Sequence, residues 1–390
     1  MTETVLLTRD LINNGEPFRE IGKAVCIEGG VVTGLHDLDG YHPASSANVV
    51  DWRDYFVIPG LVDCHDHLGL ETGDERAQAM EHDFTNVLRG VYNARRLLAA
   101  GITTLRSVGE KNYMDVYWRD AINAGWMQGP RLVICGRFIM RTGGHAWYLG
   151  READGPDQIR TAVREQVREG ADAIKLMITG GASTPGSVPT LSDYTDEEIA
   201  AAVDEAHRLG RKIAAHVHGG SGARAAIAAG IDSIEHGVYL TDEDLALMAE
   251  KGTFLCQTYG VYKAAMTSAE TPEFMRENCA RAAKRYLATL ANARRHGVKV
   301  VFGGDTHHAD PSSEFQALIE AGFTPLEALR AGTVTAAELL GLEGRIGAVV
   351  PGGFADLVAL KRSPLDHPEA LGEVASVMKE GVVYNPAGLL

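Results

Sequence analysis

The segment VIPGLVDCHDHLGL, residues 57–70, decides how the rest of the sequence is interpreted. An apolar run follows a Pro-Gly pair and ends in two histidines, His65 and His67, with one aspartate between them. On a strand, residues two apart point to the same side, so both imidazoles share one face and Asp66 occupies the other. Asp63 lies deeper on the histidine face, where we expect structural hydrogen bonds. The pattern predicts a buried strand that ends at a chemically active face.

The whole sequence has the composition of a large globular protein. It has 390 residues, 45% hydrophobic content and a formal net charge of −15. Such a chain can bury one large core, with or without a smaller satellite domain. The negative charge disfavours phosphate backbones, so we expect no nucleic-acid partner. No apolar run reaches membrane-spanning length, so we expect no membrane partner.

The cysteines and the N-terminus bear on the cellular compartment. Five cysteines occur without a C-x-x-C pair, which argues against a disulfide framework and against a zinc finger. The start, MTETVLLTRD, lacks the basic and long apolar segments of a signal peptide. We therefore expect reduced, mostly buried thiols in a cytoplasmic protein.

From residue 57 onward, short apolar runs alternate with amphipathic helical stretches. The eight apolar runs span residues 60–67, 102–108, 131–136, 173–179, 212–218, 232–237, 253–259 and 299–305. Eight such alternations predict an α/β fold, a (β/α)8 TIM barrel over roughly residues 57–310. A doubly wound sheet is the alternative, but it usually shows a glycine-rich loop after its first strand, and none is present.

The two ends of the chain are rich in strand patterns. The segment GKAVCIEGGVVTGL, residues 22–35, has two β-rich runs separated by Gly29-Gly30, a hairpin signal. Helices expected at 314–321 and 325–340 lead to further strand patterns in the tail. We expect both ends to build one small β-sandwich. The predicted division is 1–56 for its N-terminal part, 57–345 for the barrel and 346–390 for its C-terminal part.

Polar residues stand at or near the ends of five predicted barrel strands. In a barrel, all carboxyl ends of the strands converge on one face, which holds the active site. The residues are His65, His67, Lys175, His216, His236 and Asp305. Two imidazoles and a carboxylate are ligands for zinc or a similar divalent ion. A histidine pair alone could simply be hydrogen-bonded or exposed, but the further strand-end residues favour a metal site.

Lys175 lies inside the apolar run DAIKLMITGG. A buried lysine must lose its charge or find partners, and desolvation lowers its pKa. The neutral amine can add carbon dioxide to give a carbamate, which could bridge two metals. A lysine paired with an acidic neighbour is the alternative. Its position between the two sets of histidines favours the bridge.

Six segments together resemble the amidohydrolase superfamily, in particular its prolidase-like and imidazolonepropionase-related dipeptidase branch. They are PGLVDCHDH, IKLMITGG, AAHVHG, IEHG, GGDTH and GFADLVAL. The resemblance implies two divalent metals, zinc first, with cobalt or manganese as alternatives. It assigns His65 and His67 to the more buried metal, carboxylated Lys175 to both metals, His216 and His236 to the second metal, and Asp305 to the first metal and to proton transfer.

The implied activity is hydrolysis of an amide in a small-molecule substrate, either a dipeptide of Xaa-Pro type or an N-acyl amino acid. Metal-activated hydroxide would attack the carbonyl, and Asp305 would carry the proton to the leaving nitrogen. The branch commonly forms homo-oligomers, so a homo-oligomer is expected.

Three residues are candidates for substrate binding: His145, which follows Gly143-Gly144, His218, and Tyr259. The resemblance places His145 and His218 near the substrate's carboxylate, although relatives carry tyrosine at the position of His218. The alternative for both is that they only support the metal ligands or pack within a loop. Arg106 is followed by Ser107 where the family usually has aspartate, and we expect Arg106 to form a salt bridge in the core.

Three other functions were weighed. A deaminase of the superfamily typically uses one metal and no strand-4 lysine, and some carry a glutamate after the strand-5 histidine, which HVHGGSGA lacks. The same binuclear site could instead cleave a carbamate, urea, cyclic amide, lactone, phosphotriester or xenobiotic-type ester. A non-catalytic binding protein on this fold is the third, but such relics usually lose ligands, and all six are kept here.

Overall fold

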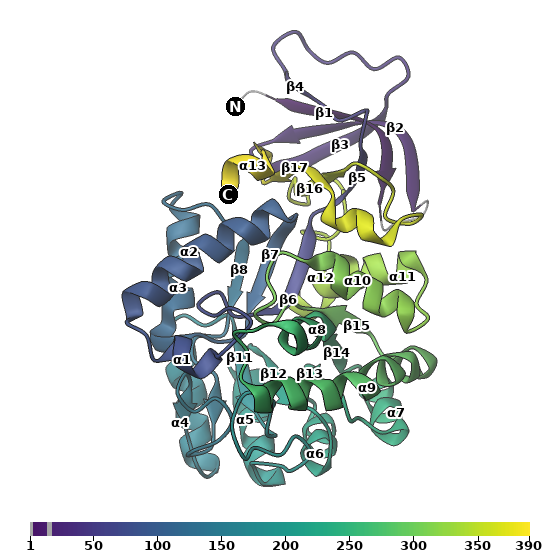
Figure 1. Ribbon diagram of the computed structural model, residues 1–390. Coiled ribbons are helices and arrows are strands. Elements are labelled where there is room, and N and C mark those ends of the chain that lie inside the picture. Colours follow the sequence, from purple (N-terminus) through teal and green to yellow (C-terminus); the bar gives the residue numbers. More distant parts are fainter. Residues whose placement is uncertain (1–2, 14–17) are drawn as a thin grey trace.

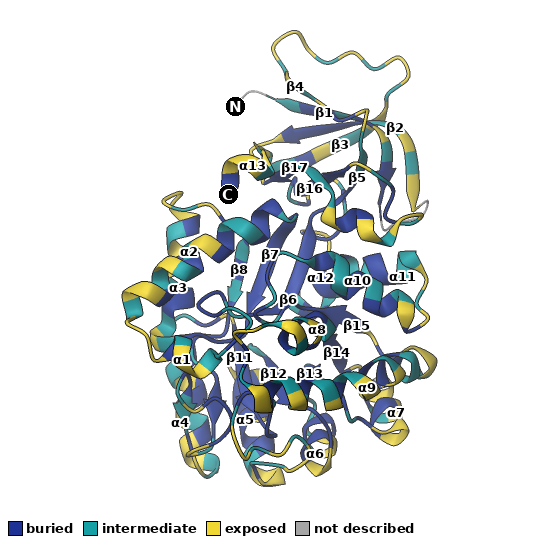
Figure 2. Cartoon of the chain, in the orientation of Figure 1, coloured by how far each residue is buried: buried dark blue, intermediate teal, exposed yellow. Residues whose placement is uncertain are grey.

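The computed structural model describes residues 3–13 and 18–390. Figure 1 shows two regions: parallel strands surrounded by helices, and a β-rich region formed by both chain ends. In Figure 2 the strands of the larger region are buried, while the helices around them expose their outer sides. No helix among the described residues is long and apolar enough to cross a membrane.

The larger region contains two parallel sheets. One comprises β6 (Leu61–Asp66), β7 (Ile102–Ser107) and β8 (Arg131–Ile134); the other comprises β9 (Ile139–Met140), β10 (Arg151–Glu152), β11 (Ala173–Met177), β12 (Lys212–Val217), β13 (Ser233–His236), β14 (Phe254–Gln257) and β15 (Val300–Phe302). Backbone hydrogen bonds link the sheets at both edges, from Asp172 N to Ile134 O at 2.8 Å and from Asp305 N to His65 O at 2.8 Å.

All eight predicted apolar runs contain a strand, which confirms the alternation. Each strand ends one to three residues before the predicted run does. The β6 strand ends at Asp66, before His67, and β15 ends at Phe302, before Asp305. The polar residues at the ends of the runs therefore leave the hydrogen-bonded ladder and turn into the loops above it.

Helices follow most of these strands along the chain. They are α1 (Glu75–Ala79), α2 (Asp83–Ala99), α3 (Met114–Asn123), α4 (Pro156–Arg168), α5 (Asp196–Arg208), α6 (Ser221–Ala229), α7 (Asp242–Lys251), α8 (Tyr259–Thr267), α9 (Glu273–His296), α10 (Pro311–Glu320), α11 (Pro325–Ala331), α12 (Val334–Leu340) and α13 (Pro386–Leu389), with 3-10 turns at Lys111–Tyr113 and Pro368–Gly372. Capping boxes at Thr195 and Thr241 begin α5 and α7, so the local sequence fixes where these helices start.

The helix predicted over 325–340 is wrong in one respect, because α11 and α12 are separate. The break lies at Gly332-Thr333, where the Gly332 carbonyl accepts a hydrogen bond from Val62 N at 2.8 Å. A Cβ on Gly332 would lie 2.2 Å from the Phe302 ring. Docking against β6 and β15 therefore overrides local helix propensity here.

The chain ends form one eight-stranded sheet. Its strands are β1 (Thr4–Ile12), β2 (Arg19–Glu28), β3 (Val31–Asp37), β4 (Asn48–Asp51), β5 (Phe56–Pro59), β16 (Leu357–Leu360), β17 (Val374–Lys379) and β18 (Val382–Tyr384). Antiparallel pairing of β5 with β16 joins the N-terminal and C-terminal strands, as predicted. The predicted hairpin is present, with φ of 57° at Gly29 and 81° at Gly30. The sheet curls on itself, because Val32 N donates to Gly353 O at 2.9 Å.

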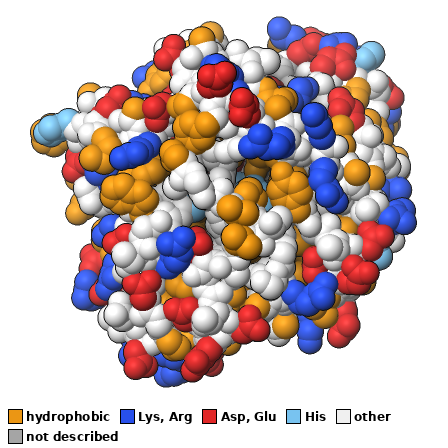
Figure 3. Space-filling view, turned by 60° about the horizontal axis from the view of Figure 1, so that its bottom comes forward, with side chains coloured by type: hydrophobic (Ala, Val, Ile, Leu, Met, Phe, Trp, Pro, Cys, Tyr) orange, Lys and Arg blue, Asp and Glu red, His pale blue; other side chains and the backbone are white. Residues whose placement is uncertain are grey.

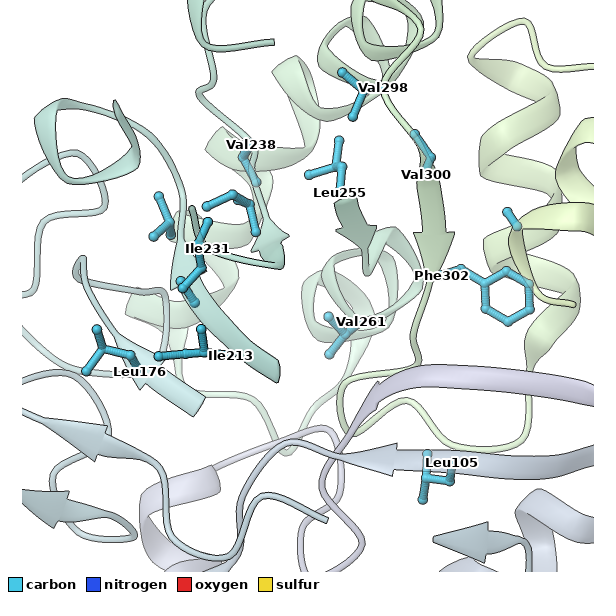
Figure 4. Close-up of a cluster of buried hydrophobic side chains, with 14 of the residues drawn as sticks. Leu105, Leu176, Ile213, Ile231, Val238, Leu255, Val261, Val298, Val300 and Phe302 are labelled. Carbon is cyan, nitrogen blue, oxygen red and sulfur yellow. The ribbon is translucent and has the colours of Figure 1, made fainter. Parts of the chain in front are cut away.

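Strand β11 shows how alternation separates core from cavity. Ile174 and Leu176 point outward into the main hydrophobic core, while Lys175 and Met177 line the cavity inside the ring of strands. Figure 4 shows this core, with Leu176 and Ile213 on neighbouring strands. All five cysteines are buried and free, which confirms that no disulfide framework exists.

Close approach of β15 to β6 requires a glycine at position 303. A Cβ on Gly303 would lie 2.4 Å from the His65 Cβ and 2.6 Å from its backbone nitrogen. We expect Gly303→Ala to cost about 1–3 kcal/mol of unfolding free energy, because overpacking cannot be relieved by a flexible side chain. Thermal denaturation followed by circular dichroism measures the loss.

The matched control is Gly388→Ala, because a Cβ on Gly388 meets nothing within 4 Å. Its melting temperature should stay at the wild-type value. Equal melting temperatures for the two variants would contradict the steric requirement at Gly303.

Candidate metal centre

A cavity opens at the carboxyl ends of the parallel strands. All six predicted metal ligands line it, together with His145 and His218. In Figure 3, hydrophobic side chains surround a hollow in which histidine is visible. The cavity brings together residues from strands that are up to 240 positions apart in the sequence, such as His65 and Asp305.

Three of the predicted ligands lie close enough together to share one ion. Atoms of His65, His236 and Asp305 all lie within 4.8 Å of one another. An Asp305 carboxylate oxygen is 3.4 Å from His65 Nε2 and 3.8 Å from His67 Nε2, and the other oxygen is 3.7 Å from His236 Nδ1. Imidazole nitrogens and carboxylate oxygens are the donor set of zinc and related divalent ions, so these residues fit such a metal.

The His65 ring is oriented by the buried carboxylate of Glu235, on the side of the ring away from Nε2. Its Nδ1 lies 2.7 Å from a Glu235 carboxylate oxygen, and the other oxygen accepts a hydrogen bond from Arg106 at 2.8 Å. Burial opposes ionisation of Glu235, but the Arg106 guanidinium holds its pKa well below the usual range. The predicted core salt bridge of Arg106 is confirmed. An ionised Glu235 makes Nδ1 the protonated nitrogen and leaves Nε2 free for a metal.

The rings of His67 and His236 are anchored in the same way. His67 Nδ1 donates to the Gly109 carbonyl at 2.7 Å, and His236 Nδ1 lies 2.8 Å from the Thr258 hydroxyl oxygen. Burial lowers the pKa of His67 to about 4, so its ring is neutral near pH 7. The His67 ring can therefore present Nε2 as a lone-pair donor, which is the usual arrangement of a ligating histidine.

Two of the proposed ligands have unusual backbone conformations. His236 has φ of 69° and Asp305 has φ of 46°, and neither is glycine. Left-handed backbone at such residues costs about 1–3 kcal/mol and persists where surrounding structure enforces it. Here the strain turns both side chains from the strand ends toward the cavity.

Lys175 is 1% exposed and forms no ion pair or hydrogen bond among the interactions of the described residues. The alternative prediction, an acidic partner, finds acidic neighbours but no ion pair: the charges of Glu235 and Asp305 act on Lys175, while Glu235 is bonded to Arg106 and His65. Desolvation is the main reason that the pKa of Lys175 is lowered. An uncharged amine at this place is the form that could react with carbon dioxide.

The remaining histidines form a contiguous group around His216. Its ring centroid is 4.6 Å from those of His236 and His145, and 4.8 Å from that of His218. Burial lowers the pKa of His145 to about 4 and that of His218 to about 3. These rings are neutral near pH 7 and can act as metal ligands or hydrogen-bonding groups.

The structure places two of the three substrate-binding candidates in the cavity and corrects the third. His145 and His218 line it, but Tyr259 does not, because its ring packs against Tyr286 with centroids 5.5 Å apart. Tyr262, three residues further on, lines the cavity instead. The predicted apolar run 253–259 ended at Tyr259, whereas α8 begins there and turns Tyr262 inward.

Sequence reasoning predicted the role of one acid beside the proposed ligands and missed the roles of two others. It expected only structural hydrogen bonds from Asp63, which does accept from His65 N at 2.9 Å and Gly304 N at 3.0 Å. The Asp66 carboxylate accepts a hydrogen bond from His308 Nδ1 at 2.8 Å, and this pair fixes the loop after β15. Glu235 was overlooked, although a glutamate inside the buried run next to His236 was a signal that could have been used.

Comparison with known proteins agrees with this geometry. Residues 56–384 match the amidohydrolase family. The chain belongs to the amidohydrolase family, and it is a hydrolase that acts on carbon–nitrogen amide bonds. The family generally uses divalent metals, and the histidine and carboxylate cluster fits that requirement.

Three similar proteins illustrate the relationship. Ochratoxinase of Aspergillus niger is 31% identical over 373 residues, covering 85% of this chain and 76% of the relative. A Xaa-Pro dipeptidase structure with bound methionine has a TM-score of 0.89 and 29% identity, and covers 98% of this chain and 100% of its own. A prolidase complexed with N-methylphosphonate-L-proline has a TM-score of 0.93, 28% identity and the same coverage. The fold of this chain is thus of the TIM-barrel type found in these hydrolases.

The Glu235 contact predicts a measurable effect on metal retention. We expect Glu235→Gln to weaken metal affinity by about 10–100-fold, because the amide no longer fixes the His65 tautomer. Metal content after dialysis against graded chelator concentrations measures it. Glu338→Gln is the control, since Glu338 is an exposed acid paired with Lys299. Unchanged metal retention in Glu235→Gln would contradict this supporting role.

Proposed function

We propose that this protein is a binuclear metal-dependent amidohydrolase that cleaves an amide in a dipeptide, of Xaa-Pro type, or in an N-acyl amino acid. It would act in the mouth of a closed (β/α)8 barrel, residues 57–345, with a small β-sandwich formed by 1–56 and 346–390. The proposed ligands are His65, His67, Lys175 as its carbamate, His216, His236 and Asp305, with zinc as the first candidate metal and cobalt or manganese as alternatives.

One observation carries the binuclear proposal: the buried amine of Lys175 forms no ion pair among the described residues and shares a cavity with both sets of histidines. A charged lysine beside metal cations would be repelled, whereas a carbamate supplies two oxygens and a negative charge. A single-metal deaminase needs no such lysine. The position therefore favours hydrolysis with two ions over deamination with one.

Bound divalent ions would supply Lewis-acid polarisation of the scissile carbonyl and a lowered pKa of water. The chain's own residues supply the proton transfer and the orientation. Burial opposes ionisation of Asp305, but the His65 imidazole beside its carboxylate keeps the pKa of Asp305 below the usual range. The ionised Asp305 can accept a proton from the attacking water and pass it to the leaving nitrogen, which leaves poorly unless protonated.

The printed activities of the relatives guide the choice of substrate. The solved neighbours include a Xaa-Pro dipeptidase and a prolidase bound to a proline phosphonate, and an ochratoxinase is among the sequence relatives. His145 and His218 are proposed to contact the substrate, since both rings line the cavity beside His216. Homo-oligomeric assembly and a cytoplasmic location stay predictions.

A hydrolysis screen tests the function. Protein reconstituted with zinc, cobalt or manganese would be incubated with Xaa-Pro and other dipeptides, N-acyl amino acids, carbamates, ureas and lactones. We expect turnover of the first two classes to exceed that of the others. Turnover confined to carbamates, ureas or lactones would move the assignment to that chemistry.

Loss of the Lys175 amine should remove one metal. We expect wild-type protein prepared with bicarbonate to hold about two divalent ions per chain and Lys175→Met to hold about one, because the bridging oxygens are gone. Elemental analysis measures the ratio. Lys299→Met, at an exposed lysine paired with Glu338, is the control and should keep both ions. Two ions in Lys175→Met would refute the bridge.

Asp305→Asn tests the proton transfer. The amide oxygen can still ligate but cannot take a proton, so we expect kcat to fall by about 10²–10⁴-fold with metal content retained. Asp310→Asn serves as the control, because asparagine keeps the N-cap of α10 that Asp310 provides. A kcat near that of the wild type in Asp305→Asn would exclude its proton role.

A further inference from the structure

The walls of the cavity beyond the metal ligands are mostly apolar. Leu70, Phe138, Leu149, Met177 and Met275 contribute to them. No arginine is among the residues that line this cavity, and the only lysine is Lys175. Apart from the proposed metals, the cavity therefore offers no fixed cation to a substrate.

One further acid faces the same cavity. Glu75, the half-buried first residue of α1, lines it together with Ser183. Among the ion pairs of the described residues, none includes Glu75. Arg76, its neighbour, instead lies over the Trp147 ring, 5.8 Å from the ring centroid. Burial raises the pKa of Glu75 to about 7, and the charge of Asp305 adds to the rise.

A second polar group in this cavity also lacks a partner. His218 is 3% exposed, and its Nδ1 has no hydrogen-bond partner within the described chain. Buried polar atoms are nearly always satisfied, so an unsatisfied one that lines a cavity indicates a ligand. The adjoining chamber, which shares His218 and Tyr262, contains Arg281, whose guanidinium has no carboxylate partner among the described ion pairs.

A carboxylate without a cation in an apolar pocket is costly unless a ligand supplies the opposite charge. The structure assigns that role to the substrate: we propose that Glu75 binds an ammonium group on the substrate's acyl side, so that the protein prefers amides carrying a free amine over those that are blocked. The proposed amine site rests on the proposed amidohydrolase function. It narrows that function, because a site for a free amine selects the unblocked dipeptide over the N-acyl amino acid. The apolar walls would hold a hydrophobic side chain on the same acyl half.

The amine could be the α-amine of an aminoacyl group or the side-chain amine of a lysine. Two matched pairs of acyl products separate these sources: L-leucine with 4-methylpentanoate, and 6-aminohexanoate with hexanoate. Each pair differs by one amine. Isothermal titration of the zinc-loaded protein gives the affinity ratio within each pair.

We expect wild-type protein to bind the amine-bearing member of at least one pair about tenfold or more tightly, as for a charge-assisted hydrogen bond. The pair that shows the preference identifies the source. Glu75→Gln should bring that ratio to within about twofold. Asp74→Asn is the matched control, because it removes the adjacent charge, keeps the N-cap of α1 and does not alter a cavity residue.

A preference that survives Glu75→Gln, or equal binding within both pairs by the wild type, overturns the proposal. A merely structural role for Glu75 would weaken both members of a pair equally and also overturns it. Hydrolysis of L-leucyl-L-proline and 4-methylpentanoyl-L-proline is measured in parallel. If neither is cleaved while the Glu75-dependent ratio persists, the amine site stands and the proposed dipeptidase activity fails.

Discussion

The site depends on one buried carboxylate, Glu235, that is shared between a guanidinium and an imidazole. Its oxygens meet Arg106 at 2.8 Å and His65 at 2.7 Å, so a single group ties β13 to β7 and β6. A buried ion pair is stabilising only when its hydrogen-bonding capacity is filled, and Ser233 donates a further hydrogen bond to it. The same contact that holds three strands together also fixes which nitrogen of His65 faces the cavity.

Much of the fold could be predicted because its strands are buried on both faces. Such strands appear in sequence as continuous apolar runs, and each of the eight predicted runs contains a strand in the structure. The proposed ligands were chosen by the same logic, since an imidazole or amine in or just after an apolar run is out of place in a purely structural strand. Lys175 and His216 stand out for this reason, one within β11 and the other near the end of β12.

The remainder could not be predicted because it depends on contacts between distant segments. Gly332 interrupts a good helical pattern only because Phe302 and Val62 occupy the space beside it. Glu75 lies on a five-residue helix with no periodic signal, and the cavity that it lines exists only in the assembled fold. Tyr259 and Tyr262 differ in role through the start of one helix, a boundary that sequence patterns locate to within a few residues.

Strand β5 ends at Pro59 and β6 begins at Leu61, so a single extended segment crosses from the end sheet to the metal cavity. Within the end sheet, β5 is clamped between β1 and the C-terminal β16. Strand β16, from the C-terminal part of the chain, therefore secures the strand that leads into β6 and His65. A chain without β16 would keep every proposed ligand yet leave β5 with only one of its two neighbours, so the placement of His65 depends on a strand that contributes nothing to the cavity itself.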